Sequence, residues 1–187
     1  MSILYLAAVS EELGDLPGDV VGVGPIAAAA NAARILATAG PQAVVLVGTA
    51  GSYPGGPPIG AVVASDRVAW SYGVAAMGLG YVPRPPAPVR SHPALIEQSR
   101  APRHDVLTTG AVTTDPTLCE RLSDGFTVEH LEAYGVALAC QHVDVPFLAL
   151  LGITNVVGAN AHAEWLANRD AARDAARDVA RRLVWPG

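Results

Sequence analysis

Residues 43–51 read Ala-Val-Val-Leu-Val-Gly-Thr-Ala-Gly, and they decide the fold of this chain. The apolar run 43–47 has the length of a strand, and its lack of polar alternation predicts a strand covered on both faces. Small residues at 48–51 let the backbone approach a ligand at the carboxyl end of that strand, where α/β sheets bind ligands. An ordinary tight turn explains the same residues equally well. The segment is neither a Walker loop nor a dinucleotide fingerprint.

Strands and helices alternate on both sides of this run. We expect strands over 1–9, 17–24, 43–47, 59–65, 107–112 and 146–153, and helices over 27–39, 132–142 and 161–183. Residues 72–102 carry many prolines and glycines, which predicts a long loop that covers a site. Alternating strands and helices predict an α/β fold with a mixed sheet flanked by helices.

Size and charge narrow the class of protein. A chain of 187 residues with 51% hydrophobic residues predicts a single domain over 1–187. The net charge of -5 and the absence of a basic cluster argue against nucleic acid and anionic membranes as partners, so a small molecule is favoured. No apolar stretch reaches the roughly 18 to 20 residues of a membrane-spanning helix, and the first residues lack the basic start of a signal peptide.

The cysteines and histidines predict neither metal nor redox chemistry. Cys119 and Cys140 stand in unrelated contexts without the spacing of metal ligands, so we expect unpaired thiols in a reducing cytoplasm. The histidines show no metal-ligand spacing either. We therefore expect no metal and no cofactor.

Two later segments place polar residues at the ends of apolar elements. Glu132 stands at the start of the predicted helix 132–142, where its carboxylate suits the adjacent 2′ and 3′ hydroxyls of a ribose. A favourable interaction with the helix dipole explains that position as well. Asn155 follows an apolar strand, and its amide offers the donor and acceptor that would read the N7 and O6 edge of a 6-oxopurine. A role in a turn or cap is the alternative.

Taken together and in order, several segments resemble the superfamily that contains 5′-methylthioadenosine/S-adenosylhomocysteine nucleosidase, purine nucleoside phosphorylase and futalosine hydrolase. Residues 7–12, Ala-Ala-Val-Ser-Glu-Glu, are similar to the nucleosidases' Gly-Ala-Met-Glu-Glu-Glu. Residues 22–29 resemble the glycine-rich loop before the next helix, and 48–51 with 59–63 resemble Gly-Ser/Thr-Ala-Gly-Gly and Ile-Gly-Asp-Val-Val. The resemblance implies a three-layer α/β/α nucleoside phosphorylase-like domain.

The resemblance also implies roles for single residues. Glu12 falls on the carboxylate that activates water, and Glu132 on the glutamate that holds the ribose hydroxyls. Asn155 falls on the residue that contacts the purine N7. The implied catalytic residues are Glu12 and Asn155, and the implied substrate-binding residues are Thr49, Ala50, Gly51, Leu131, Glu132 and Thr154. Asparagine at 155 is closer to futalosine hydrolase, which has an Ile-Ser-Asn segment.

Three features depart from the pattern of the superfamily. The link between the first helix and the glycine-rich loop is short, residues 16–21, where a β-hairpin is usual. Leu131 replaces the usual methionine, and Leu151 replaces an arginine. Tyr134 stands where a small residue is expected. The domain is therefore expected to be shortened near the N-terminus.

The expected activity is hydrolysis of the N-glycosidic bond of a purine nucleoside, with a 6-oxopurine, futalosine-like substrate. No arginine near residues 22–24 or 48–51 suits a phosphate, which favours water over phosphate as the nucleophile. The alternatives are a methylthioadenosine/S-adenosylhomocysteine-type nucleosidase, a purine nucleoside phosphorylase, and a protein that binds a nucleoside without turning it over. The resemblance implies a homodimer or a higher homo-oligomer.

Overall fold

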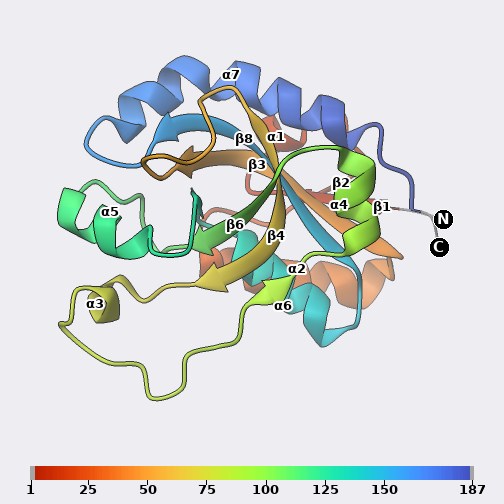
Figure 1. Ribbon diagram of the computed structural model, residues 1–187. Helices are drawn as coiled ribbons and strands as arrows, with labels where there is room; N and C mark the ends of the chain where they lie inside the picture. Colours follow the sequence, from red (N-terminus) through yellow and green to blue (C-terminus); the bar gives the residue numbers. More distant parts are fainter. Residues whose placement is uncertain (1–2, 186–187) are drawn as a thin grey trace.

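Strands and helices alternate along residues 3–185, the part of the chain that the computed structural model describes (Figure 1). The strands are β1 (Ile3–Ala7), β2 (Gly18–Val20), β3 (Ala43–Ser52), β4 (Val62–Trp70), β5 (Val89–Arg90), β6 (Arg103–Thr108), β7 (Val128–His130) and β8 (Phe147–Val156). The helices are α1 (Ser10–Leu13), α2 (Pro25–Ala39), α3 (Gly73–Ala76), α4 (Pro93–Ser99), α5 (Pro116–Leu122), α6 (Ala133–His142) and α7 (Ala161–Ala180).

The strands form one mixed sheet in which five strands close a ring. The order is β2-β1-β3-β7-β6-β4-β5, and β8 pairs with both β3 and β4. The ring therefore runs β3, β8, β4, β6, β7 and back to β3. Strands β1, β3 and β8 are mutually parallel neighbours. Their carboxyl ends meet at one edge of the sheet, which is where ligands bind in α/β folds.

Strand β3 is buried on both faces, as its apolar run predicts. Val44 and Leu46 belong to one apolar core together with residues of α2 and α6. Val45 and Val47 belong to a second core, on the opposite face, with residues of α1, α4 and α7. Because successive side chains of a strand point to opposite faces, this one strand contributes to both cores. The predicted α/β fold, a mixed sheet between helical layers, is confirmed.

Two glycines let helices approach closely. A Cβ on Gly152 of β8 would stand 2.3 Å from the carbonyl oxygen of Ala172, so α7 packs directly on the backbone of β8. A Cβ on Gly135 of α6 would stand 2.5 Å from the carbonyl oxygen of Pro25 at the start of α2. In Figure 1, α7 lies along one side of the sheet, while α2 and α6 lie on the other.

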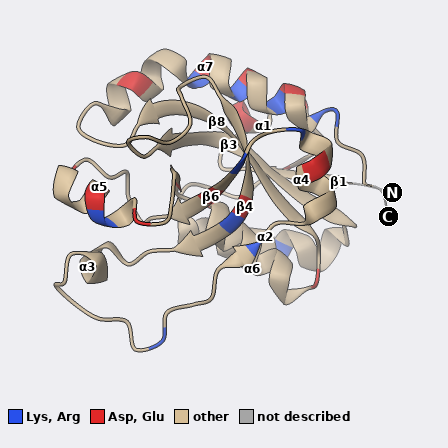
Figure 2. Cartoon of the chain, in the orientation of Figure 1, with Lys and Arg blue, Asp and Glu red and all other residues tan. Residues whose placement is uncertain are grey.

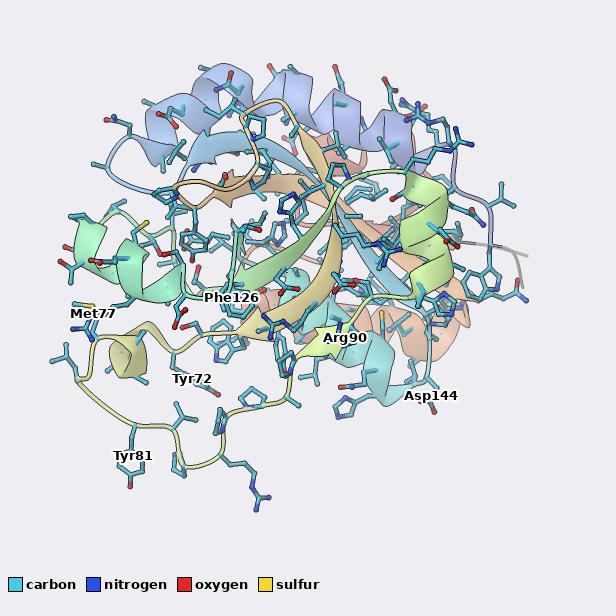
Figure 3. The ribbon with its side chains drawn as sticks, in the orientation of Figure 1. Tyr72, Met77, Tyr81, Arg90, Phe126 and Asp144 are labelled. Atoms are coloured by element: carbon cyan, nitrogen blue, oxygen red, sulfur yellow. The ribbon has the colours of Figure 1, made fainter. Side chains whose placement is uncertain are left out.

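The prediction of a structureless loop over 72–102 is wrong. This segment contains α3, β5 and α4, and α4 is anchored by Leu95 and Ile96, which are buried in the second core. The true loop runs between α3 and β5, with Tyr81 on its outer side and 85% exposed (Figure 3). Each of these elements has fewer than eight residues, which is too short for a periodic pattern to stand out among the prolines and glycines.

Other boundaries moved for identifiable reasons. The strand expected at 107–112 is β6, which begins at Arg103, because the polar residues Arg103 and His104 pair with β4. Helix α5 and strand β7 were not predicted. The expected strand 17–24 shrinks to β2, whose three residues are exposed at the edge of the sheet.

The remaining elements agree with the prediction more closely. The first strand is confirmed as β1, with residues 1–2 outside the described part. Helices α2 and α6 lie close to their expected limits, and α7 ends at Ala180 rather than at 183. Cys119 and Cys140 are buried and unpaired, as expected. Within residues 3–185, no helix combines the length and the apolar character needed to cross a membrane.

Candidate active site

Glu12 lies in α1, immediately after the first strand, and its carboxylate is oriented by β3. Its Oε1 accepts hydrogen bonds from the backbone N–H of Thr49, at 2.9 Å, and from the Thr49 hydroxyl, also at 2.9 Å. The indole N–H of Trp165 donates to that hydroxyl oxygen at 3.2 Å, so the hydroxyl proton is free to point at Glu12. Two donors thus occupy Oε1, while Oε2 accepts no hydrogen bond from residues 3–185.

His130 ends β7 and is fixed as a neutral ring. Its Nδ1 accepts hydrogen bonds from the backbone N–H groups of Glu132 and Ala133, each at 3.1 Å. An atom that accepts two hydrogen bonds carries no proton, so the proton of the neutral ring is on Nε2. Burial lowers the pKa of His130 to about 4, which agrees with a neutral imidazole. His130 therefore presents Nε2 as a donor at ordinary pH.

Glu132 stands at the N-terminus of α6 and is 4% exposed. Its Oε1 accepts a hydrogen bond from the backbone N–H of Gly24 at 2.7 Å, and its Oε2 lies 3.4 Å from Nδ1 of His130. Burial raises the pKa of Glu132 above its ordinary value. The glycine-rich loop before α2 thus donates a backbone hydrogen bond to the carboxylate of Glu132.

Gly48 marks the point where these residues converge. A Cβ on Gly48 would stand 3.3 Å from Nε2 of His130 and 3.4 Å from each carboxylate oxygen of Glu12. Helix α1, strand β3 and strand β7 therefore bring one carboxylate and one imidazole to the same glycine, and Glu132 lies on the far side of the imidazole. Burial also raises the pKa of Glu12.

Asn155 lies further along the same edge, opposite Gly51. The register of β3 and β8 shifts here, so that Ala50 pairs with Ile153 and Gly51 with Asn155. The Asn155 amide nitrogen donates to the carbonyl of Val156 at 3.2 Å, and its Oδ1 accepts from the Thr154 hydroxyl at 2.8 Å. One amide N–H of Asn155 is left for another acceptor.

A cavity of about 420 Å³ begins two residues beyond Asn155. No arginine or lysine stands among its lining residues, which are Pro54, Thr114, Pro116, Cys119, Glu120, Ser123, Val157, Gly158 and Ala159. Most of these side chains are small or apolar. With Glu120 and no cationic residue in its lining, the cavity suits an uncharged group better than an anion.

Glu129 forms hydrogen bonds with residues that adjoin the lining of this cavity. Its carboxylate accepts hydrogen bonds from the Tyr53 hydroxyl at 3.0 Å, from the Thr113 backbone N–H at 3.0 Å and from the Thr113 hydroxyl at 2.5 Å. Tyr53 and Thr113 directly precede Pro54 and Thr114, two of the lining residues. Sequence reasoning missed this role, since its three donors belong to two residues, Tyr53 and Thr113, that are far apart in the chain.

The structure brings most of the expected site residues to one edge of the sheet. Thr49 contacts Glu12, and the carbonyl of Ala50 lies 3.1 Å from the Thr154 hydroxyl. A Cβ on Gly51 would stand 3.0 Å from the Asn155 amide nitrogen. Leu131 is half-buried and makes no side-chain hydrogen bond.

His130 and Trp165 were not among the expected site residues. The position of His130 two residues before Glu132 was the available signal. The hydrogen bond between its ring and the Glu132 amide depends on the tertiary structure. The same holds for the hydrogen bond between Trp165 and Thr49, which are far apart in the chain.

Both the sequence and the fold of this chain are similar to those of known proteins. A family model described as the phosphorylase superfamily matches residues 17–185, so Glu12 lies before the matched region. The 5′-methylthioadenosine/S-adenosylhomocysteine nucleosidase of Pseudoalteromonas translucida is 28% identical over 166 residues, covering 78% of this chain and 71% of its own.

Solved structures share the fold at low sequence identity. The 5′-methylthioadenosine/S-adenosylhomocysteine nucleosidase of Neisseria meningitidis, in complex with methylthio-immucillin-A, superimposes with a TM-score of 0.81 at 17% identity, covering 96% of each chain. Futalosine hydrolase of Helicobacter pylori superimposes with a TM-score of 0.82 at 14% identity, covering 96% of this chain and 95% of its own. At these identities the likeness concerns the fold alone.

Proposed function

This chain belongs to the phosphorylase superfamily, and on that premise we propose that it hydrolyses the N-glycosidic bond of a purine nucleoside. The observation that carries the proposal is the convergence of two carboxylates, the half-buried Glu12 and the buried Glu132, on either side of His130. Cleavage of the bond develops positive charge on the ribose, and carboxylates stabilise such charge.

Each carboxylate has a separate task in this proposal. Glu132 accepts hydrogen bonds from the ribose hydroxyls, and it is held for this by the Gly24 amide. Glu12 takes a proton from water as the water oxygen bonds to C1′. The bond from C1′ to the base nitrogen breaks, and the base leaves with its electron pair. The base then takes a proton from solvent, so that one water molecule is consumed for each base released.

Asn155 supports a 6-oxopurine as the leaving base. Its remaining amide N–H can donate to an acceptor on the base, and the negative charge of a departing 6-oxopurine spreads onto O6. As a neutral amide it cannot act as a general acid. We propose a futalosine-like nucleoside as the first candidate substrate, with the base end toward the adjoining cavity.

Water is the proposed nucleophile rather than phosphate. The Gly24 N–H, which a glycine-rich loop could offer to an anion, already donates to Glu132. The pair of carboxylates would repel a phosphate dianion in the same site. Both features favour hydrolysis over phosphorolysis.

A second candidate substrate is 5′-methylthioadenosine or S-adenosylhomocysteine. The observation that favours it is the relative from Pseudoalteromonas translucida, a nucleosidase named for these two compounds.

A nucleoside panel tests the proposal. The protein is incubated with inosine, futalosine, 5′-methylthioadenosine and S-adenosylhomocysteine, with and without phosphate, and the released base is quantified by chromatography. We expect base release that is independent of phosphate. Strictly phosphate-dependent turnover would identify a phosphorylase, and binding without release of any base would identify a nucleoside-binding protein. The identity of the base that is released fastest decides between the two substrate candidates.

A further inference from the structure

We propose that the nucleophilic water binds above Gly48, between Nε2 of His130 and Oε2 of Glu12, so that His130 is a further catalytic residue. This inference rests on the proposed function, which it deepens by placing the reacting water. Three independent features carry it: the oxygen that Glu12 leaves available, the tautomer of His130, and the space that Gly48 provides.

The first feature is that the two carboxylate oxygens of Glu12 differ in their hydrogen bonds. Oε1 accepts both the backbone N–H and the hydroxyl of Thr49. These are the two lone pairs that an sp² carboxylate oxygen offers in its plane. A base acts through an atom with an unoccupied lone pair, which leaves Oε2 as the atom that receives the proton of water.

The second feature is the fixed tautomer of His130. Two backbone amides at the start of α6 donate to Nδ1, so the ring cannot exchange its proton to that side without losing both hydrogen bonds. Nε2–H is thus a permanent donor. A donor beside a general base orients the water, because it occupies one lone pair while a water proton points at the carboxylate. The second lone pair is then free to attack.

The third feature is the absence of a side chain at position 48. The point where a Cβ would stand lies 3.3 Å from Nε2 and 3.4 Å from both carboxylate oxygens. The backbone of Gly48 does not have a positive φ, so its conformation alone does not require glycine. The lack of a side chain is what keeps this point open.

The hydrolytic step balances with these groups. The water oxygen forms a bond to C1′ as the bond from C1′ to the base nitrogen breaks, and the electron pair of that bond leaves with the base. One water proton passes to Oε2 of Glu12. His130 keeps its Nε2 proton throughout, so it holds the water without being consumed.

Gly48→Ala tests the space. The added methyl group would extend into the space above Gly48 where the water is proposed to bind. We expect kcat to fall at least about 100-fold while KM changes little, because the carboxylate that binds ribose is untouched. Gly73→Ala is the matched control, since the Cβ at position 73 meets only Leu118, at 4.0 Å. Wild-type kcat in Gly48→Ala would overturn the proposal.

Two substitutions of His130 separate its donor from its acceptor. Asn places an oxygen where Nδ1 stands, so His130→Asn keeps an acceptor for the α6 amides but removes the donor. Gln places an amide N–H near Nε2 but removes the acceptor. We expect kcat to fall about 10- to 100-fold in His130→Asn, with unchanged KM, and to be partly restored in His130→Gln. A purely structural role predicts the reverse order, with His130→Gln the weaker enzyme.

A crystal structure of the wild-type protein separates this inference from the proposed function. We expect an ordered water within 3.2 Å of both Nε2 of His130 and Oε2 of Glu12, the usual limit of a hydrogen bond. No water there would overturn the inference whether or not a nucleoside is cleaved. If the panel finds turnover but Gly48→Ala and His130→Asn match the wild type, the inference fails and the function stands. If the panel finds none, the function fails and the crystallographic water alone decides the site.

Discussion

Glu12 and Glu132 are like-charged groups held in one site, and burial raises the pKa of each. Each is partly compensated by hydrogen bonds that favour its charged form, from Thr49 in one case and from the Gly24 amide in the other. A general base must be ionised to accept a proton. The residues around Glu12 therefore decide the pH at which the site can work.

Glu12→Gln tests the proposed base. The amide keeps the shape of the side chain but cannot take a proton, so we expect kcat to fall about 10²- to 10⁴-fold with binding retained. The measurement is steady-state base release together with calorimetric titration of the substrate. Glu11→Gln is the control, because Glu11 is exposed and its carboxylate accepts a hydrogen bond from the neighbouring Ser10. Wild-type turnover in Glu12→Gln would remove Glu12 from this role.

Thr49→Val tests the tuning of Glu12. The hydroxyl donates to the charged form of the carboxylate, so its removal raises the pKa of Glu12 further. Activity requires the charged form, and the acidic limb of kcat/KM against pH should therefore move to higher pH. Thr38→Val on α2 is the control, since its hydroxyl bonds only to carbonyls of its own helix. An unmoved acidic limb would contradict the assignment.

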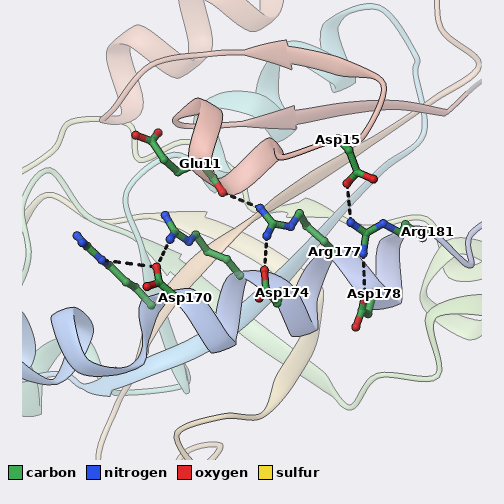
Figure 4. A network of polar contacts seen from close by, with 9 residues as sticks. Glu11, Asp15, Asp170, Asp174, Arg177, Asp178 and Arg181 are labelled. Carbon is green, nitrogen blue, oxygen red and sulfur yellow. Dashed lines mark hydrogen bonds and ion pairs between the residues drawn. The ribbon is translucent and has the colours of Figure 1, made fainter.

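At the scale of elements, α7 supports the site from the face of the sheet on which α1 also lies. Arginines recur every fourth residue along it, at 169, 173, 177 and 181, and aspartates follow at 170, 174 and 178 (Figure 4). Charged residues gather along this helix in Figure 2. Ion pairs three residues apart join Asp170 to Arg173 and Asp174 to Arg177.

Arg177 does more than pair with its neighbour on the exposed face of the helix. Its side chain is 16% exposed, and its Nη1 donates to the carbonyl of Glu11 at 2.7 Å. The short α1 places that carbonyl against α7, and Arg181 pairs with Asp15 in the connection that follows. Helix α7 therefore holds the segment that carries Glu12, in a chain whose connection to β2 is short.

Arg177→Met tests this support. Methionine keeps the length of the stem but loses the bond to Glu11, and we expect the free energy of unfolding to fall by about 1 kcal/mol. We also expect a lower kcat, because α1 would no longer be fixed. Urea denaturation and base release measure the two effects. Arg181→Met is the control, and it should change both less, since Arg181 is more exposed. Equal effects of the two substitutions would contradict a special role for Arg177.

Gly152→Ala tests the packing of α7 on the sheet. The new Cβ would meet the Ala172 carbonyl oxygen at 2.3 Å, and both atoms belong to packed backbone. We expect the free energy of unfolding to fall by about 3 kcal/mol or more, as in severe overpacking. Thermal and urea denaturation measure the loss. Gly73→Ala at the exposed start of α3 is the control, and a Gly152→Ala protein as stable as the wild type would contradict the close approach.

Elements with a strong pattern could be predicted from the sequence, and short polar ones could not. The sequence predicts β3 and β8 from their apolar runs. It predicts α2 from its alanine-rich composition. Strand β7 has three residues, and α5 has seven, too few for a periodic pattern. Among site residues, the resemblance placed Glu12 and Glu132 where the structure brings them together. It could not supply His130, because its ring comes to the same glycine as Glu12, Gly48, only when β7 lies beside β3.

In the whole molecule, as far as residues 3–185 describe it, two large apolar cores lie on either face of the ring of strands, and a third, smaller apolar cluster includes Tyr53 and Cys119. Strand β3 pairs with β1, β7 and β8, so a shift of this one strand would disturb both cores and the site. The polar residues of the site follow the carboxyl ends of β1, β3 and β8. The arrangement explains why residues from the beginning, middle and end of the chain meet at one edge.

We expect a homodimer or a larger homo-oligomer, as the resemblance implies. Large apolar side chains are exposed near the site, with Val23 63% and Ile26 85% exposed on either side of Gly24. Others, Leu79 and Tyr81, stand on the loop between α3 and β5. Size-exclusion chromatography with light scattering should give a mass of at least twice the 19.2 kDa of one chain. A particle of 19.2 kDa would contradict the expectation.

The burial of Glu12 has a consequence for heat resistance. Because its pKa is higher in the folded chain, its contribution to stability is present at acidic pH and is lost as the pH rises through that folded value. At neutral pH the folded protein thus carries a charge that unfolding would release to water. Selection of variants for thermal stability should therefore favour a neutral residue at position 12. The most stable variants would then lack catalytic activity.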